Sequence, residues 1–363
     1  MDKITLRKIF KQPFANEHWN RLLVEVFHAS DVYETPQQFT FDNENAKYVG
    51  YFNGHVETPT GDAVGLFSYS SSLQVSRKKV SLRNLVAKII NPKYGSFDAA
   101  IVAYYDEKEW RISYICDLKN SSTSAKRFSF LVGDPNSEHN TAVNRLCEIK
   151  KDYELSDLFN AFSVERLTKE FFNEYTAIYK EFCDRAIDPT YFDFDGFDKK
   201  KIRDYVKLLL GRILFLCFVQ KKGWMNGDKH FLRNIFDAYC NQIKTGEDFR
   251  FLDNVLEKIF FECLNKNHSG LYQTIVLEYG NNGKIDVPFL NGGLFECKEL
   301  DIPRSVFGKE LWLNLFNLLG SYNFTIDEND PTDAEIGIDP EMLGKIFESQ
   351  LEDNKDKGAF YTP

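Results

Sequence analysis

A cluster of basic side chains between Val75 and Phe97 is the first feature of this chain with a chemical use. The segment contains six lysine and arginine residues and no acidic residue: Arg77, Lys78, Lys79, Arg83, Lys88 and Lys93. Cations at this density can bind DNA phosphates, and six such contacts would make the affinity fall with salt at a slope of about −5. A solvated helix face has the same composition, because charge runs usually face water. Both interpretations stay open.

Two shorter basic segments lie near aromatic residues. The first contains Lys199, Lys200, Lys201 and Arg203, and the second reads Lys221-Lys222-Gly223-Trp224. A cation beside an aromatic ring can bind a phosphate while the ring stacks on a base. The alternative is structural, with lysines that favour a helix C-terminus and a tryptophan in the core.

The last part of the sequence predicts a helix followed by a turn. Asp339 is a good N-cap, and Pro340 suits the first helical position. One apolar stripe follows, formed by Leu343, Ile346, Phe347 and Leu351. A charged run then leads into the segment Gly358-Ala359-Phe360-Tyr361-Thr362-Pro363. On spacing alone, this is an ordinary amphipathic helix with a polar tail.

The segment from Asp339 to Pro363 resembles the junction that opens the methyltransferase domain of type IIG (type IIS) restriction–modification enzymes. Further segments resemble that family in the same order: Phe162–Phe172, Ile213–Trp224, Leu290–Glu296 and Tyr322–Asn329. Together they cover roughly residues 125–363, whereas residues 1–120 match more weakly. The resemblance implies that this chain is the N-terminal half of a longer enzyme, with its target-recognition domain downstream.

The resemblance also implies an adenine-N6 DNA methyltransferase that uses S-adenosylmethionine. Phe360, Tyr361 and Thr362 match the family motif that lines the cofactor pocket. The catalytic Asn/Asp-Pro-Pro-Tyr/Phe tetrapeptide, which holds the flipped adenine, does not occur in this chain. We therefore expect an incomplete cofactor site, which neither binds S-adenosylmethionine appreciably nor methylates DNA alone.

The family usually carries a metal-dependent endonuclease at its N-terminus. Its carboxylates hold Mg²⁺, and a lysine two residues after one of them activates water. Asp62, just before a predicted strand, and Glu25, on the preceding helix, are the candidate catalytic residues. The strand after Asp62 reads Leu66-Phe67-Ser68-Tyr69-Ser70-Ser71, without an acid or a lysine. The resemblance thus implies a nuclease-like domain that is degenerate or uses another site.

Composition and charge exclude several classes of protein. The net charge of −9 argues against a chain that wraps nucleic acid over its whole surface. Seven scattered cysteines without a Cys-x-x-Cys pair predict reduced thiols rather than a zinc ribbon or a disulfide framework. The sequence shows no secretory signal and no apolar run long enough for a membrane span. We expect a cytoplasmic protein with no membrane partner.

Hydrophobic periodicity predicts a domain of helices and strands, and then a helical one. The predicted elements of the first are a helix at 16–29, strands within 39–53, a strand at 63–67, a helix at 75–90, and strands at 99–105, 110–116 and 128–132. Turns are expected at Asn53-Gly54 and at Thr58–Asp62. Helices follow at 155–159, 164–182, 202–220, 230–243 and 251–264, and residues 268–300 are expected to be irregular.

These elements give an α/β or α+β nuclease-like domain over residues 1–135 and a mostly α-helical connector over 136–300. Residues 301–363 then lead into a Rossmann-like methyltransferase domain. Double-stranded DNA is the expected partner, and Mg²⁺ is expected if the nuclease is active. Two rivals stay open: the catalytically inactive half of a modification-only phage-defence methyltransferase, and an unrelated helical scaffold.

Overall fold

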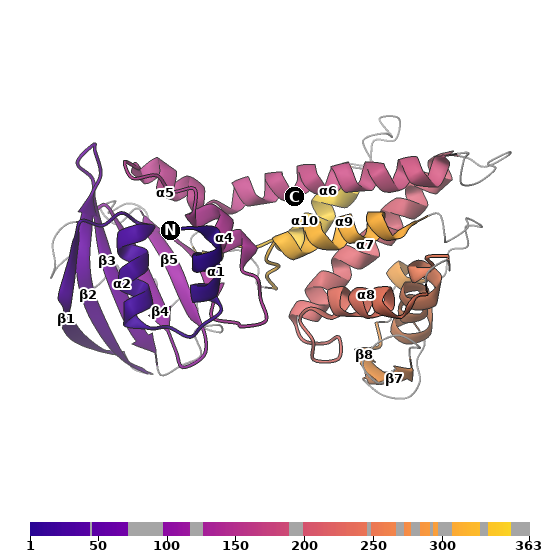
Figure 1. Cartoon of the computed structure of the whole chain (residues 1–363), viewed down its shortest axis with the longest axis horizontal. Helices are drawn as coiled ribbons and strands as arrows, with labels where there is room; N and C mark the ends of the chain where they lie inside the picture. Colours follow the sequence, from indigo (N-terminus) through magenta and orange to yellow (C-terminus); the bar gives the residue numbers. More distant parts are fainter. Residues whose placement is uncertain are drawn as a thin grey trace. The chain divides into compact units, whose positions relative to one another are not determined.

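A computed structural model describes most of the chain. The described residues are 1–43, 46–71, 97–116, 126–188, 199–244, 248–265, 272–276, 284–290, 293–296, 307–326 and 333–349. They form two compact units, which Figure 1 draws in one view. The sheet unit contains Met1–Thr168, Ser321–Asn323 and Asp327–Ile338, and the helical unit contains Lys169–Gly320, Phe324–Ile326 and Asp339–Pro363. Residues 136–168 and 333–338 thus belong with the sheet.

The sheet unit is built on seven strands in the order β1-β2-β3-β4-β5-β6-β9. These are β1 (Asp31–Asn43), β2 (Ala46–Glu57), β3 (Ala63–Ser71), β4 (Ala99–Tyr105), β5 (Trp110–Cys116), β6 (Lys126–Val132) and β9 (Asp333–Glu335). Neighbours are antiparallel except for the parallel pairs β3/β4 and β6/β9. The predicted mixture of helices and strands is confirmed, and β4 and β5 have the predicted bounds. The predicted helix at 75–90 lies outside the described residues.

The predicted turn at Asn53-Gly54 is wrong, because both residues lie inside β2. The register of β2 against β3 shifts between Phe52 and Gly54. Gly54 has a φ of +131°, and a Cβ built there would lie 2.1 Å from the carbonyl oxygen of Asp31 in β1. The Asn-Gly pair therefore marks a bulge at which two strands approach closely, a use of glycine that a local turn signal does not distinguish.

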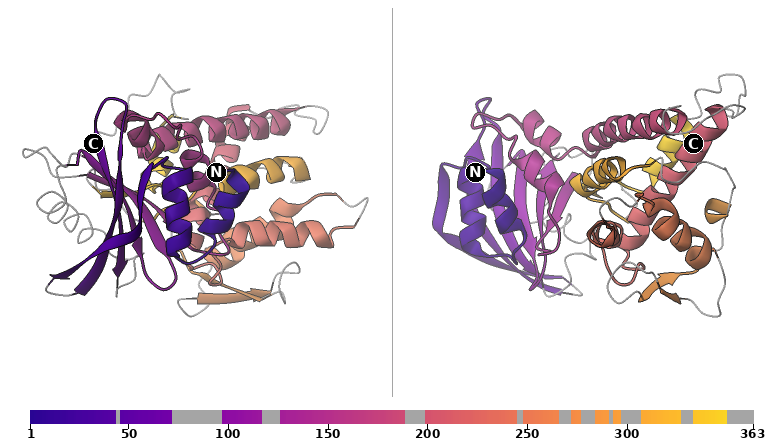
Figure 2. Two further views of the ribbon diagram at one scale, coloured as in Figure 1. Left: turned by 60° about the vertical axis from the view of Figure 1, so that its left-hand side comes forward. Right: turned by 45° about the vertical axis from the view of Figure 1, so that its right-hand side comes forward.

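One face of the sheet is covered by the helices α1 (Lys3–Phe10), α2 (Asn16–Glu25), α4 (Asn140–Leu146) and α5 (Leu155–Ala161). Figures 1 and 2 show α1 and α2 side by side against it. Trp110 of β5 is the centre of this layer, with ring centroids 5.9 Å from Phe10 and 6.4 Å from Trp19. Beyond α5, Phe162 packs 5.0 Å from Phe130 of β6. These side chains are almost fully buried, as the predicted helix stripe around Trp19 requires.

The opposite face of the sheet carries buried polar side chains. Side chains alternate between faces along a strand, so Arg111 and Ser113 point away from the face that holds Trp110. Arg111 pairs with Glu335 of β9 at 2.9 Å, and the Ser113 hydroxyl lies 2.8 Å from that of Ser129. The Arg111 side chain is fully buried. This edge of the sheet is thus joined by charge as well as by backbone hydrogen bonds.

The helical unit follows the predicted pattern. The helices predicted at 164–182 and 202–220 are longer than predicted, the one predicted at 230–243 is one residue shorter at each end, and the one predicted at 251–264 consists of two π-helical segments. Its elements are α6 (Val164–Ile187), α7 (Lys199–Lys221), α8 (Phe231–Gln242), the π-helical segments Leu252–Leu256 and Lys258–Leu264, the 3₁₀ segment Gly293–Phe295, α9 (Lys309–Ser321) and α10 (Glu341–Ser349). Asp339 caps α10 as predicted, because its Oδ1 accepts from the amide of Met342 at 3.2 Å. Residues 268–300 contain strands β7 (Tyr272–Val276) and β8 (Lys284–Pro288), which the sequence did not predict.

Aromatic rings fill the core of the helical unit, in line with the high phenylalanine content. Trp312 of α9 has its ring centroid 5.2 Å from that of Phe182 and 5.5 Å from that of Phe251. Its indole N–H donates to the carbonyl of Phe307 at 2.9 Å, so the buried ring keeps a polar partner. Among the described helices, none has both the length and the apolar character that a membrane crossing requires.

The six described cysteines are free. Cys183, Cys217 and Cys263 are buried. Burial raises the pKa of the Cys183 thiol to about 11 and that of Cys263 to about 12. These two thiols are therefore protonated near neutral pH, and a protonated thiol is a poor nucleophile and a poor metal ligand.

Candidate nucleic-acid interface

Asp62 lies in the tight turn that joins β2 to β3. The amide of Thr58 donates to the Asp62 carbonyl at 2.9 Å, and Gly61 within the turn has a φ of +90°. The Asp62 carboxylate accepts from the Thr60 hydroxyl at 2.9 Å, and the same hydroxyl contacts the Glu154 carboxylate. The predicted turn at 58–62 is confirmed. The carboxylate stabilises this turn whether or not it has a second, catalytic use.

Glu25 is the last residue of α2 and has a partner of its own. Its carboxylate pairs with Arg21 one turn earlier, at 2.6 Å. Nowhere in the described part of the chain do three histidine, cysteine, aspartate or glutamate side chains come together as a metal site. Asp62 and Glu25 therefore stay candidates on separate elements, each with hydrogen-bonding partners.

Two of the predicted site groups fall outside the described residues. The first is the basic segment with Arg77, Lys78, Lys79, Arg83 and Lys88. The second is the cofactor motif with Phe360, Tyr361 and Thr362. Both stay predictions from the sequence.

Lys221 and Lys222 lie where α7 ends and a six-residue turn begins. Lys221 is half-buried and Lys222 is exposed. The Lys222 Nζ lies 4.8 Å from the centroid of the Trp224 ring, a cation–π contact, and Trp224 is 41 % exposed. The alternative of a core tryptophan at this position is therefore wrong. An exposed ring beside lysines can stack on a base while the cations face phosphates.

The other basic segment of the helical unit lies at the opposite end of the same helix. Lys199, Lys200 and Lys201 occupy the exposed first turn of α7. At 1.5 Å per residue, the 23 residues of α7 separate the two segments by roughly 35 Å. Cations in a first turn are disfavoured by the helix dipole, so these lysines do not stabilise the helix end. The two segments are separate basic sites rather than one patch.

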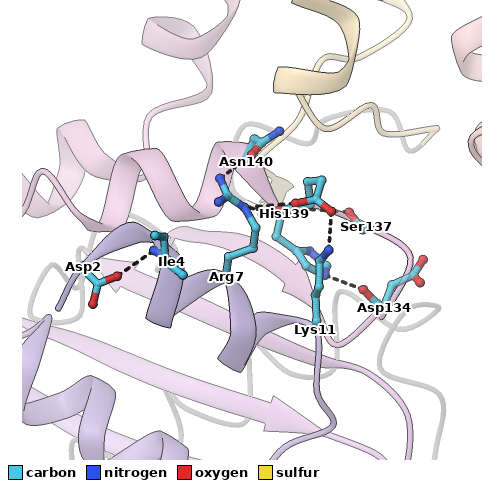
Figure 3. Close-up of polar contacts among 9 residues, drawn as sticks. Asp2, Ile4, Arg7, Lys11, Asp134, Ser137, His139 and Asn140 are labelled. Atoms are coloured by element: carbon cyan, nitrogen blue, oxygen red, sulfur yellow. Dashed lines mark hydrogen bonds and ion pairs between the residues drawn. The ribbon is translucent and has the colours of Figure 1, made fainter. Parts of the chain in front are cut away.

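A third group of cations, at the start of the chain, is used within the fold. Figure 3 shows Arg7 of α1 and Lys11, the residue after this helix, facing the segment that leads into α4. Arg7 donates to the Asn140 side chain at 2.9 Å, and Lys11 pairs with the Glu138 carboxylate. The hydrogen bond from Lys11 lowers the pKa of Glu138. His139 adopts a left-handed conformation with φ +49°, and its Nε2 lies 2.9 Å from the Asp134 carbonyl oxygen. These contacts hold α1 to α4, so Arg7 and Lys11 are poor candidates for phosphate binding.

Sequence reasoning missed the buried charges. Arg111 and Arg127 lie inside strands of the sheet unit, and Arg212 lies inside α7; each is at most 2 % exposed. The alternation of apolar and polar residues from Trp110 to Ser113 could have shown that β5 has a polar face. No comparable local signal identifies Arg212 or its acceptors, which lie more than 80 residues later in the chain.

Comparison with known proteins finds no relative of this chain. No protein-family model, no curated protein and no solved structure matches this chain. Of the two basic sites in the described part of the chain, the turn after α7, with Lys221 and Lys222, is the candidate interface, because it places the exposed ring of Trp224 beside Lys222.

Proposed function

We propose that this chain is the N-terminal portion of a bifunctional restriction endonuclease and adenine-N6 DNA methyltransferase. It engages double-stranded DNA and couples a nuclease-like domain to methyl transfer. Its partners are DNA and the methyltransferase and target-recognition domains of the same protein. S-adenosylmethionine would bind only to the full protein, and Mg²⁺ would bind here if the nuclease-like domain is active.

The observation that carries this proposal is the packing of the resembling segments against one another. The ring of Phe324, from the block at 322–329, lies 6.0 Å from that of Phe171 and 5.2 Å from that of Phe218. Phe171 and Phe218 come from two other blocks, at 162–172 and 213–224. Arg212 directly precedes the block at 213–224. It donates to the carbonyl oxygens of Leu294 and Glu296, which both lie within the block at 290–296. Four blocks scattered over the sequence thus contribute to one core in the helical unit, which is what the proposal requires of segments that belong to one domain.

Binding of double-stranded DNA tests the proposal directly. We expect the whole chain to bind a labelled duplex with an affinity that falls as salt rises from 50 to 200 mM. Each phosphate contact contributes about 0.9 to the slope of log K against log salt. The double variant Lys221→Gln/Lys222→Gln should therefore lower the slope by roughly 2. Fluorescence anisotropy at four or more salt concentrations measures it.

Lys180 supplies the matched control for this measurement. It is exposed on α6, next to Glu181. Lys180→Gln removes one charge at a distance along the chain from this turn, whereas the double variant removes two charges within it, and Lys180→Gln should leave the slope unchanged. A duplex affinity that does not depend on salt, or an equal effect of the two variants, would contradict the proposed interface.

The catalytically inactive alternative has one specific observation in its favour. The strand that follows Asp62, β3, carries neither an acidic residue nor a lysine, and its buried Ser68 donates instead to Asn53 at 3.1 Å. A Mg²⁺-dependent cleavage assay on the whole chain separates the two forms of the proposal. If the chain cuts DNA and Asp62→Ala abolishes the cutting, the bifunctional enzyme is supported. Duplex binding without any cutting supports the inactive half of a modification-only methyltransferase.

A further inference from the structure

Trp224 is exposed, whereas the other tryptophans are core residues. The sequence contains four tryptophans. Trp19, Trp110 and Trp312 are at most 1 % exposed, whereas Trp224 is 41 % exposed. An indole ring is the largest apolar surface that a side chain can offer, and leaving it in water sacrifices burial energy. Tryptophan is enriched at interfaces, where its ring is buried against a partner.

The turn that displays Trp224 is hydrogen-bonded and anchored. The Trp224 amide donates to the Val219 carbonyl at 3.3 Å, and the Gly227 amide donates to the Gly223 carbonyl at 3.2 Å. Gly223, Asn226 and Gly227 adopt left-handed conformations, with φ of +76°, +54° and +69°. The next side chain, Met225, is fully buried and fixes the turn to the core. The backbone that carries the ring is therefore fixed before any ligand arrives, which lowers the entropy cost of binding.

The charges around the ring favour an anionic ligand. Residues 221–230 contain three lysines and one aspartate, in a chain whose net charge is −9. The aspartate, Asp228, accepts hydrogen bonds from the His230 amide at 2.7 Å and from the Asn234 side chain at 2.8 Å. Its carboxylate is thus engaged within the turn. Lys222, by contrast, is exposed and lies over the ring face.

We propose that Trp224 and Lys222 form a stacking site for an unpaired nucleotide. The base stacks on the indole face opposite Lys222, and Lys222 takes the phosphate beside it. This inference rests on the proposed function and narrows it to a substrate class, which is single-stranded or locally unpaired DNA. In an intact duplex both faces of a base are covered by its neighbours, so only an unpaired base can stack on the ring.

The whole chain offers a direct probe, because the other three tryptophans are buried. Acrylamide quenching of tryptophan fluorescence therefore reports mainly on Trp224. We expect a single-stranded 12-mer to quench this emission and to protect it from acrylamide. The matching duplex, which contacts the lysines without stacking on the ring, should quench the emission much less. Fluorescence anisotropy with labelled oligonucleotides then gives the affinities of the variants.

Trp224→Ala should weaken single-strand binding by roughly 5- to 100-fold, the loss expected for one base stack. Trp224→Phe should keep part of the affinity. Lys222→Gln should reduce the single-strand salt slope by about 0.7, the value for one phosphate. Phe159→Ala removes another exposed aromatic side chain, which is 45 % exposed in the sheet unit, and should change neither quantity.

The outcomes separate this inference from the proposed function. Duplex binding together with an unchanged single-strand affinity in Trp224→Ala overturns the stacking site and leaves the proposed function standing. Single-strand binding through Trp224 without any duplex binding overturns the proposed function and leaves the stacking site standing. If Trp224 stays open to acrylamide at saturating oligonucleotide, the ring is not a nucleotide site, and a protein partner becomes the better assignment.

Discussion

Replacing Glu335 by glutamine is expected to lower the free energy of unfolding of the sheet unit by about 3–5 kcal/mol. The Glu335 carboxylate pairs with the Arg111 guanidinium at 2.9 Å, and their side chains are 9 % and 0 % exposed. Glutamine has nearly the same shape, so packing is preserved. The buried positive charge of Arg111 then loses a negative partner in a region that water cannot reach.

Hydrogen–deuterium exchange measures this loss within the sheet unit. The amide of Ile336 donates to the Ser129 carbonyl at 2.8 Å, so it reports on the junction of β6 and β9. A loss of about 3–5 kcal/mol raises exchange through unfolding by roughly 100- to 1000-fold or more. Glu25→Gln is the control, because it breaks the exposed pair with Arg21 in the same unit. Such a pair contributes only about 0.3–0.5 kcal/mol.

A double variant distinguishes the cost of a lone buried charge from the net contribution of the pair. Arg111→Met combined with Glu335→Leu removes both charges and fills the space with apolar atoms. We expect it to recover most of the stability that Glu335→Gln loses, because well-packed apolar residues often replace a buried ion pair without loss. A double variant less stable than either single variant would show that the pair itself is the larger stabilising term.

The ion pair between Arg111 and Glu335 also limits which fragments of this protein are suitable for experiments. β9 comes from residues 333–335, yet it pairs with β6 and supplies the partner of Arg111. A fragment such as residues 1–150 would lack this strand and would leave the Arg111 charge without Glu335. Assays of the proposed nuclease activity therefore need the whole chain, since inactivity of the fragment would also follow from its incomplete sheet.

Local sequence signals predicted those elements whose cause is local. The apolar runs at 99–105 and 110–116, separated by the charged turn at 106–109, gave β4 and β5 with their observed bounds. The stripe around Trp19 predicted α2, although that helix ends at Glu25 rather than at residue 29. In both cases burial of one face or of a whole strand sets the pattern of apolar residues, so that the pattern in turn predicts the element.

Features that depend on distant parts of the chain were not predicted. Gly54 has a turn signature but serves a close approach to Asp31, which the sequence around it does not reveal. β9 has three residues, too few for any periodicity. The candidate site shows the same limit, because Lys222 and Trp224 could be named from their types and spacing. Whether Trp224 or Met225 faces the core depends on the left-handed residues of the turn.

The second large effect is expected at Arg212, in the middle of α7. Its Nε and one terminal nitrogen donate to the carbonyl oxygens of Leu294 and Glu296, both at 2.6 Å. Its guanidinium also lies 5.5 Å and 5.2 Å from the ring centroids of Phe260 and Phe261. Arg212→Met keeps the length of the side chain but leaves these carbonyls without their charged donor. We expect a loss of about 3–5 kcal/mol, because a hydrogen bond to a charged group contributes about 1.5–3 kcal/mol.

Denaturant unfolding followed through the near-ultraviolet signal of the aromatic core measures this effect. Arg203→Met is the control, since Arg203 is exposed on the same helix and its replacement should change stability by less than about 0.5 kcal/mol. Equal unfolding midpoints for the Arg203 and Arg212 variants would contradict the role assigned to Arg212.

Arg212→Lys tests whether geometry or charge matters at this position. Lysine keeps the positive charge, but its single ammonium cannot reproduce the planar fork that reaches two carbonyls at once. It also stacks less well on the rings of Phe260 and Phe261. We therefore expect Arg212→Lys to recover less than half of the loss seen with methionine. Full recovery would mean that charge alone holds the 3₁₀ segment Gly293–Phe295, and that the two hydrogen bonds are interchangeable with one.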